Sequence, residues 1–128
     1  WNELLKFSRR SEYAMNRWAS RYGYENSARA ILDKAKKGNN GRYAAVNLMN
    51  YATIEFRMFR GTLKLNTFMA TLELVNAIID VAINYTEDDL HKLSWSEFVS
   101  NIKEAELIQY LKERNLYVNE NINSEEEM

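Results

Sequence analysis

The segment Thr53–Phe59 limits how this chain can fold more than any other stretch, because its residues alternate in character. Threonine, glutamate and arginine alternate there with isoleucine, phenylalanine and methionine, which is the pattern of a strand with one buried side. The apolar run Tyr43–Asn50 predicts a second strand, and the short turn near residues 50–52 favours an antiparallel hairpin. An isolated hairpin is marginal in water, so we expect this one to lie on helices or to join other strands.

Glu55 and Arg57 fall on the same side of the predicted strand. Side chains two residues apart on a strand point the same way and lie about 7 Å from each other, so this pair can address one ligand. A carboxylate suits Mg²⁺ or Mn²⁺, and an arginine can grip a phosphate or a carboxylate with two hydrogen bonds. The spacing therefore predicts a site for a magnesium–nucleotide complex. The alternative from spacing alone is a salt bridge on a solvated sheet surface.

A longer pattern surrounds this pair. It begins with Arg-Tyr and an apolar run that contains asparagine, and it continues as Thr-Ile-Glu-Phe-Arg-x-Phe-Arg-Gly-Thr-Leu before a helix. Over Arg42–Ile79 it resembles the C-terminal part of the amidoligases, and the Arg-Arg-x-x-Tyr-Ala run at Arg9–Ala14 adds to the resemblance. That family belongs to the carboxylate–amine ligases related to glutamine synthetase and glutamate–cysteine ligase. Its members activate a carboxylate with ATP as an acyl phosphate, which an amine then attacks.

The resemblance implies roles for four residues. Glu55 matches the strand glutamate that ligates a catalytic metal, and Arg57 matches the arginine that contacts the substrate or the transferred phosphoryl group. Arg42 lies thirteen residues before Glu55, where related enzymes place an arginine that binds ATP phosphate. Arg60 could join these residues at the phosphate only if a bulge or turn begins at Phe59.

The resemblance also implies that the site is incomplete. The family's other metal ligands are acidic residues on earlier strands and a histidine, in an N-terminal half that this chain does not contain. The chain begins with Trp1, so we expect a C-terminal fragment of a larger ligase-like protein, with the missing N-terminal half as its partner. We expect ATP and Mg²⁺ in the complete protein and no cofactor or catalysis in the fragment alone. The lone histidine, His91, is expected at the surface.

Composition sets broader limits. A chain of 128 residues with 46% hydrophobic residues can form one stable domain, which we predict over residues 1–118, followed by a disordered acidic tail over 119–128. The absence of cysteine excludes disulfides and zinc–thiolate sites and fits a cytoplasmic protein. With a single histidine, it also argues against a Cys-His nucleophile pair. No uninterrupted apolar run reaches the length of a membrane span, so we expect no membrane partner.

The net charge of −1 conceals a division along the chain. Residues 1–64 hold 13 Lys and Arg against 5 Asp and Glu, whereas residues 65–128 hold 4 against 13. A basic half can bind nucleic acid, nucleotide or another polyanion. The alternatives are that the two halves attract each other, or that the charges are spread over solvated helix faces.

Helical periodicity accounts for most of the remaining chain. An amphipathic helix is predicted over residues 2–22, with Arg10, Arg17 and Arg21 as a basic stripe. A second helix is capped by Asn26 or Ser27, and a third runs from Asn66 or Thr67 to about Tyr85. Thr86 and Ser94 start two more helical segments, of which the Ser94–Glu97 pair has the capping-box pattern and the run after Ser94 extends to about Asn115. The prediction is an α+β fold with about five helices and one β-hairpin, similar to the C-terminal part of a glutamine-synthetase-like ligase.

Three functions fit these observations. The first is the C-terminal part of an ATP-dependent amidoligase whose carboxylate and amine substrates the sequence does not specify. The second is a nucleic-acid-binding module that uses the basic N-terminal half. The third is an assembly module, homo-oligomeric or not, whose hairpin pairs with a partner strand.

Overall fold

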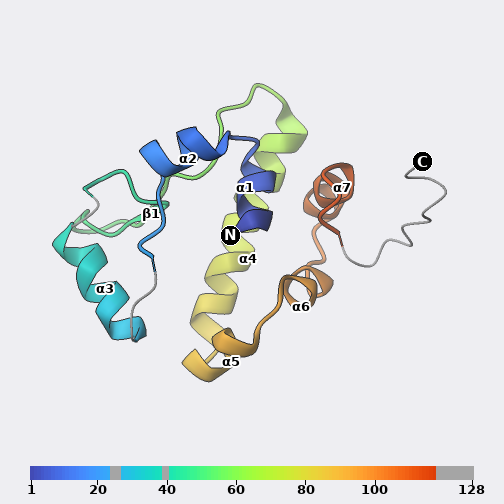
Figure 1. Cartoon of the computed structure of the whole chain (residues 1–128). Coiled ribbons are helices and arrows are strands. Elements are labelled where there is room, and N and C mark those ends of the chain that lie inside the picture. The colour runs from blue at the N-terminus through green and yellow to red at the C-terminus, as the bar shows by residue number, and fades with distance from the viewer. Residues whose placement is uncertain (24–26, 39–40, 118–128) are drawn as a thin grey trace. The chain divides into compact units, whose positions relative to one another are not determined.

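The computed structural model describes residues 1–23, 27–38 and 41–117 (Figure 1). The chain divides into two compact units, Trp1–Gly61 and Thr62–Met128. The prediction of one domain over residues 1–118 stays a prediction. The predicted tail at 119–128 lies outside the described residues.

The first unit contains three helices and two short strands: α1 (Asn2–Ser8), α2 (Glu12–Trp18), α3 (Ala28–Lys37), β1 (Val46–Asn47) and β2 (Glu55–Phe56). The second contains four helices: α4 (Leu65–Asn84), α5 (Glu87–Lys92), α6 (Trp95–Ser100) and α7 (Ala105–Glu113). The mainly helical α+β class with an antiparallel hairpin is confirmed, with seven helices in the described ranges where about five were expected. The likeness to a glutamine-synthetase-like ligase stays a prediction.

The prediction of one helix over residues 2–22 is wrong, because two serines interrupt it. The Ser8 hydroxyl donates to the Leu5 carbonyl at 2.7 Å and accepts from the Arg10 N–H at 3.1 Å. Arg9 takes a left-handed conformation with φ 60°, and the Ser11 hydroxyl starts α2 by accepting a backbone hydrogen bond. Serine side chains compete in this way with the helical backbone ladder. The proposed arginine stripe is consequently split between helix and loop.

The hairpin is shorter than predicted but has the expected antiparallel pairing. Val46 lies opposite Phe56, and Asn47 lies opposite Glu55. Beyond the strands, the Arg57 N–H still donates to the Ala45 carbonyl at 2.8 Å. The other edge of this segment bonds to Ser20, which accepts from the Ala45 N–H at 2.7 Å and forms an isolated parallel bridge with Ala44. The segment after α2 therefore holds β1 from the side opposite to β2.

The hairpin packs on the first two helices through its apolar side. Met58 and Ala45 are buried with Met15 and Ala19 of the α2 region. The half-buried residues packed against this cluster are Trp1, Leu4, Leu5, Val46, Phe56 and Phe59. Strand pairing ends at Glu55, so Ile54 belongs to the connecting loop and stays exposed. Because the apolar side of the hairpin faces the core, Glu55 and Arg57 lie on its opposite side.

The second unit is organised by packing of α4 on α7. Leu74 of α4 and Leu107 and Leu111 of α7 are fully buried. The Glu73 carboxylate accepts the Leu107 N–H at 2.9 Å and so satisfies a free backbone donor in the first turn of α7. The predicted continuous helix from Trp95 to Asn115 is wrong, because α6 ends at Ser100 and α7 begins only at Ala105.

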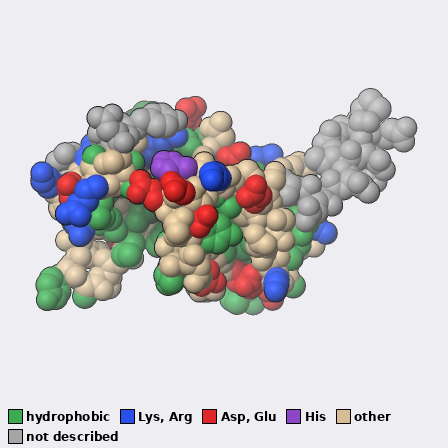
Figure 2. All heavy atoms as spheres, turned by 90° about the horizontal axis from the view of Figure 1, so that it is seen from below, with side chains coloured by type: hydrophobic (Ala, Val, Ile, Leu, Met, Phe, Trp, Pro, Cys, Tyr) green, Lys and Arg blue, Asp and Glu red, His purple; other side chains and the backbone are tan. Residues whose placement is uncertain are grey.

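Side-chain caps fix most of the helix starts. Ser27 caps α3, as predicted, and Gly38 ends it in a left-handed conformation. Both bonds of a capping box form at Thr86 and Asp89. At Ser94 and Glu97, the pair with the capping-box sequence, the Ser94 hydroxyl accepts a hydrogen bond from the Glu97 N–H. His91 is exposed, as expected, and appears in purple among acidic side chains in Figure 2.

Replacing Leu107 by alanine is expected to destabilise the second unit by about 2–5 kcal/mol, because a fully buried leucine leaves a cavity. Urea denaturation followed by circular dichroism measures this loss. Leu90→Ala is the matched control, since Leu90 is exposed on α5, and its effect should stay within about 0.5 kcal/mol. Equal losses for the two variants would contradict the packing described for α4 and α7.

Glu73 makes the stability of the second unit depend on pH. Burial raises its pKa above 4.5, the neighbouring Glu106 and Glu104 add to the rise, and the Leu107 N–H opposes it. The folded state therefore favours the protonated form, and the stability that protonation contributes is lost as pH rises through the folded-state pKa. Glu73→Gln should gain stability relative to the native chain as pH rises above 4.5 in urea denaturation series. A pH-independent difference, or the same trend in Glu87→Gln, would refute this assignment.

Candidate functional site

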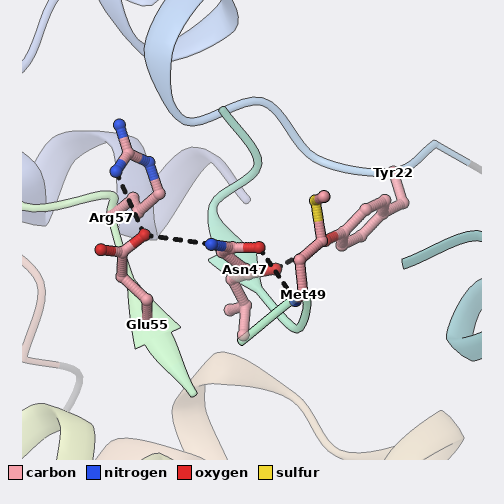
Figure 3. A network of polar contacts seen from close by, with 6 residues as sticks. Tyr22, Asn47, Met49, Glu55 and Arg57 are labelled. Carbon is pink, nitrogen blue, oxygen red and sulfur yellow. Dashed lines mark hydrogen bonds and ion pairs between the residues drawn. The ribbon is translucent and has the colours of Figure 1, made fainter. Parts of the chain in front are cut away.

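Glu55 is the centre of a polar network on the outer side of the hairpin (Figure 3). Its Oε1 atom accepts from Arg57 Nη1 at 3.1 Å and from Asn47 Nδ2 at 3.2 Å. Asn47 comes from β1, Glu55 from β2, and Arg57 follows directly after β2. The predicted neighbours Glu55 and Arg57 are thus brought together, and the cross-strand partner adds a third group.

Asn47 is held by bonds at both ends of its amide. Besides donating to Glu55, its Oδ1 atom accepts the Met49 N–H at 3.0 Å, and its side chain is almost fully buried. The neighbouring Val46 carbonyl accepts the Tyr22 hydroxyl at 2.6 Å. Buried amides need such partners, so the amide has one orientation and presents its N–H group to Glu55. This role of Asn47 was not predicted; the signal is an asparagine within an apolar strand.

The network lowers the pKa of Glu55 below its ordinary value. The hydrogen bond from Asn47 lowers the pKa of Glu55 most, the bond from Arg57 lowers it further, and the charges of Arg57 and Arg42 add to both. Partial burial opposes these effects. The charge of Arg42 is the smallest of these lowering influences, and the predicted phosphate-binding role of Arg42 stays a prediction. The Glu55 side chain is 40% exposed, so it remains accessible to a ligand.

Arg57 lies in an aromatic and cationic environment. Its guanidinium carbon is 5.5 Å from the centre of the Tyr43 ring, and Tyr43 in turn meets Trp18 edge to face at 5.2 Å. Arg17 lies over the Trp18 ring at 4.9 Å. The Arg57 Nε atom is buried and has no hydrogen-bond acceptor among the described residues. These contacts fix the guanidinium against Tyr43.

Arg60 is separated from the network. Its side chain is exposed after β2, and within the described part of the chain no hydrogen bond or ion pair joins it to Glu55 or Arg57. Met58 and Phe59 both pack on the core, so the strand alternation ends at Phe59. A bulge or turn beginning at Phe59 was the condition for Arg60 to reach the phosphate. The alternation does change there, but Arg60 has no hydrogen bond or ion pair with Glu55 or Arg57 in the described part of the chain, so its phosphate-binding role stays a prediction.

Glu55 is the sole carboxylate of this network, and one oxygen already accepts two hydrogen bonds. The described residues include no group of three or more metal-ligating side chains. Mg²⁺ commonly binds one or two protein carboxylates and completes its shell with water and substrate phosphates. Glu55 could therefore supply one ligand to a divalent ion, whose coordination shell water, substrate phosphates or further carboxylates would have to complete.

Comparison with known proteins returned no match, whether to family models, to characterised proteins or to solved structures.

Replacing Asn47 by alanine is expected to raise the pKa of Glu55, because the largest stabilising contact of the carboxylate is lost. Titration of the Glu55 side-chain carbon by NMR measures the pKa directly. Arg57→Met should raise it as well, since a hydrogen bond and a nearby charge are removed together. Asn76→Ala changes an exposed asparagine of the second unit and should have no effect. An unaltered Glu55 pKa in both hairpin variants would show that the network does not form.

Proposed function

We propose that this chain is the C-terminal part of an ATP-dependent amidoligase and contributes to the site where ATP activates a carboxylate. The observation that carries the proposal is the Glu55 carboxylate, which accepts hydrogen bonds from Asn47 and Arg57 at one oxygen and whose pKa is lowered by these bonds and by the charges of Arg57 and Arg42. An anionic ligand for a metal thus lies beside the cationic Arg57, which can bind phosphate. The Thr53–Phe59 pattern and its surroundings, which resemble the amidoligases, supply the reaction class.

In this proposal each residue has a separate task. The carboxylate of Glu55 would hold a divalent ion, and such an ion would neutralise charge on the ATP phosphates. Arg42 and Arg57 would grip phosphate oxygens, and stacking on Tyr43 keeps the Arg57 guanidinium in place. Asn47 is a positioning residue, because it orients Glu55 and does not itself reach outward.

The reaction proceeds by two displacements. An oxygen of the substrate carboxylate attacks the terminal phosphorus of ATP, which forms an acyl phosphate and releases ADP. The amine then attacks the acyl carbon, loses a proton and expels phosphate, so that an amide remains. Such transfers depend on positioning and on stabilisation of developing charge, which arginines close to a carboxylate-bound ion supply. A single carboxylate cannot complete the shell, so we expect no catalysis by this chain alone.

Nucleic-acid binding is the second candidate, and a specific observation favours it. Arg17, Trp18 and Tyr43 lie next to one another in the basic half of the chain, with Arg17 over the Trp18 ring and Tyr43 at its edge. Aromatic rings beside arginines suit unpaired bases and their phosphates. That function predicts affinity for single strands that falls steeply with salt concentration, because phosphate contacts release counterions.

Titration calorimetry of Mg²⁺-ATP into the longest natural chain that contains these residues tests the first candidate. Glu55→Gln and Arg57→Ala should each weaken binding at least tenfold, which corresponds to about 1.4 kcal/mol. Arg29→Ala is the matched control, because Arg29 is an exposed arginine of α3 in the same unit.

If the native chain and the three variants bind Mg²⁺-ATP with the same affinity, Glu55 and Arg57 form only a surface salt bridge. A single-stranded oligonucleotide that binds tightly, in a salt-dependent manner and without need of Glu55, would instead favour the second candidate.

A further inference from the structure

One side of α4 carries large apolar side chains that the other helices of the second unit leave exposed. The exposed members, with their exposed fractions, are Leu65 (74%), Phe68 (50%), Leu72 (49%), Ile79 (38%) and Ile83 (73%). Successive helical residues turn by about 100°, which places these five on the side opposite to buried Ala70 and Leu74. α4 is therefore apolar on two sides, and exposed patches of this kind mark interaction sites.

The spacing of these residues specifies the kind of partner. Leu65, Leu72 and Ile79 recur every seven residues, and Phe68 and Val75 occupy the positions between them. Steps of three and four residues are those of the a and d positions in a helix that pairs with another helix. We call Leu65, Phe68, Leu72, Val75, Ile79 and Ala82 the α4 seam. An exposed apolar helix side could contact many kinds of partner, whereas a seven-residue repeat of apolar residues favours a partner helix.

Charge allows the partner to be a second copy of the same helix. α4 contains two charged residues, Glu73 and Asp80, and both lie at positions outside the seam. Glu73 is moreover bonded to the Leu107 N–H of its own unit. Two seams can therefore meet without opposing carboxylates, although residues 65–128 carry a large acidic excess.

We propose that two copies of this chain associate by antiparallel pairing of their α4 seams. In that arrangement Leu72 faces Val75 of the other copy, Phe68 faces Ile79, and Leu65 faces the small Ala82. The pairs are repeated by a two-fold axis, as a self-complementary interface requires. Antiparallel pairing also opposes the helix dipoles and separates the acidic Glu87–Asp89 segments that follow the two helices.

The extent of the seam sets the strength of the association. The four large exposed side chains of the seam, with Val75 and Ala82, would bury on the order of 1,000 Å² in total over the two copies, which is near the lower limit for a specific interface. The dimer should therefore be reversible, with a dissociation constant in the micromolar range. The proposal is independent of the function assigned to Glu55, because it uses residues of the second unit only.

Sedimentation velocity over a concentration series tests this pairing. The native chain should shift from monomer to dimer as its concentration increases, whereas Leu72→Glu and Ile79→Glu should remain monomers with unchanged helical circular dichroism. Leu90→Glu adds the same charge at an exposed leucine of α5 and should dimerise like the native chain. The chain has no cysteine, so introduced cysteines report orientation without background. A mixture of Leu72→Cys and Val75→Cys chains should form mixed disulfides in excess of either self-pair.

Several outcomes would overturn the proposal. A native chain that stays monomeric throughout, or a dimer that survives both glutamate substitutions, would exclude the seam as an interface between copies. Preferential self-pairing of Leu72→Cys would exclude the antiparallel arrangement. α4 is also long and apolar enough to cross a bilayer by length and composition. Binding of a monomeric chain to phosphatidylcholine vesicles, lost in Leu72→Glu, would assign the seam to lipid.

Discussion

The pairing of Asn47 with Glu55 across the hairpin is the constraint on which the candidate site depends. This register turns Phe56 and Met58 toward the core and Glu55 and Arg57 away from it. A slip by one residue would exchange the two sides and place the carboxylate in the core. The buried methionines and phenylalanines therefore do more than stabilise the first unit. They fix which side of the strand meets a ligand.

The same register explains why Glu55 is suited to its proposed task. An exposed glutamate on a strand would ordinarily be mobile and only weakly paired. Here a buried amide and the Arg57 guanidinium hold one of its oxygens, and these two hydrogen bonds, with the charges of Arg57 and Arg42, lower its pKa. The other oxygen is left for a ligand. Such pre-organisation is what electrostatic sites require, because little rearrangement accompanies binding.

The sequence predicted features that depend on local pattern. Alternation predicted the shared side of Glu55 and Arg57, and the caps at Ser27 and Thr86 and the long apolar helix also follow from short-range signals. Periodicity did not predict the break near Ser8, since a serine side chain can replace the backbone ladder there. It likewise overlooked the break between α6 and α7.

The rest of the site depends on contacts between segments distant in sequence. Asn47 meets Glu55 across the hairpin, and Trp18 meets Tyr43 only after α2 packs on the strands. No spacing rule joins such residues in a single sequence. Similarly, the apolar stripe of α4 could be read from its period, but its division into a packed side and an exposed seam requires α7 in place.

The most direct test of the central claim is paramagnetic broadening of NMR signals by Mn²⁺-ATP in the longest natural chain. If the hairpin holds the metal–nucleotide complex, signals of Asn47, Glu55 and Arg57 should broaden at the lowest additions, and Mn²⁺ without nucleotide should affect them less. Broadening confined to the acidic second unit, or its absence from the hairpin, would contradict the assignment.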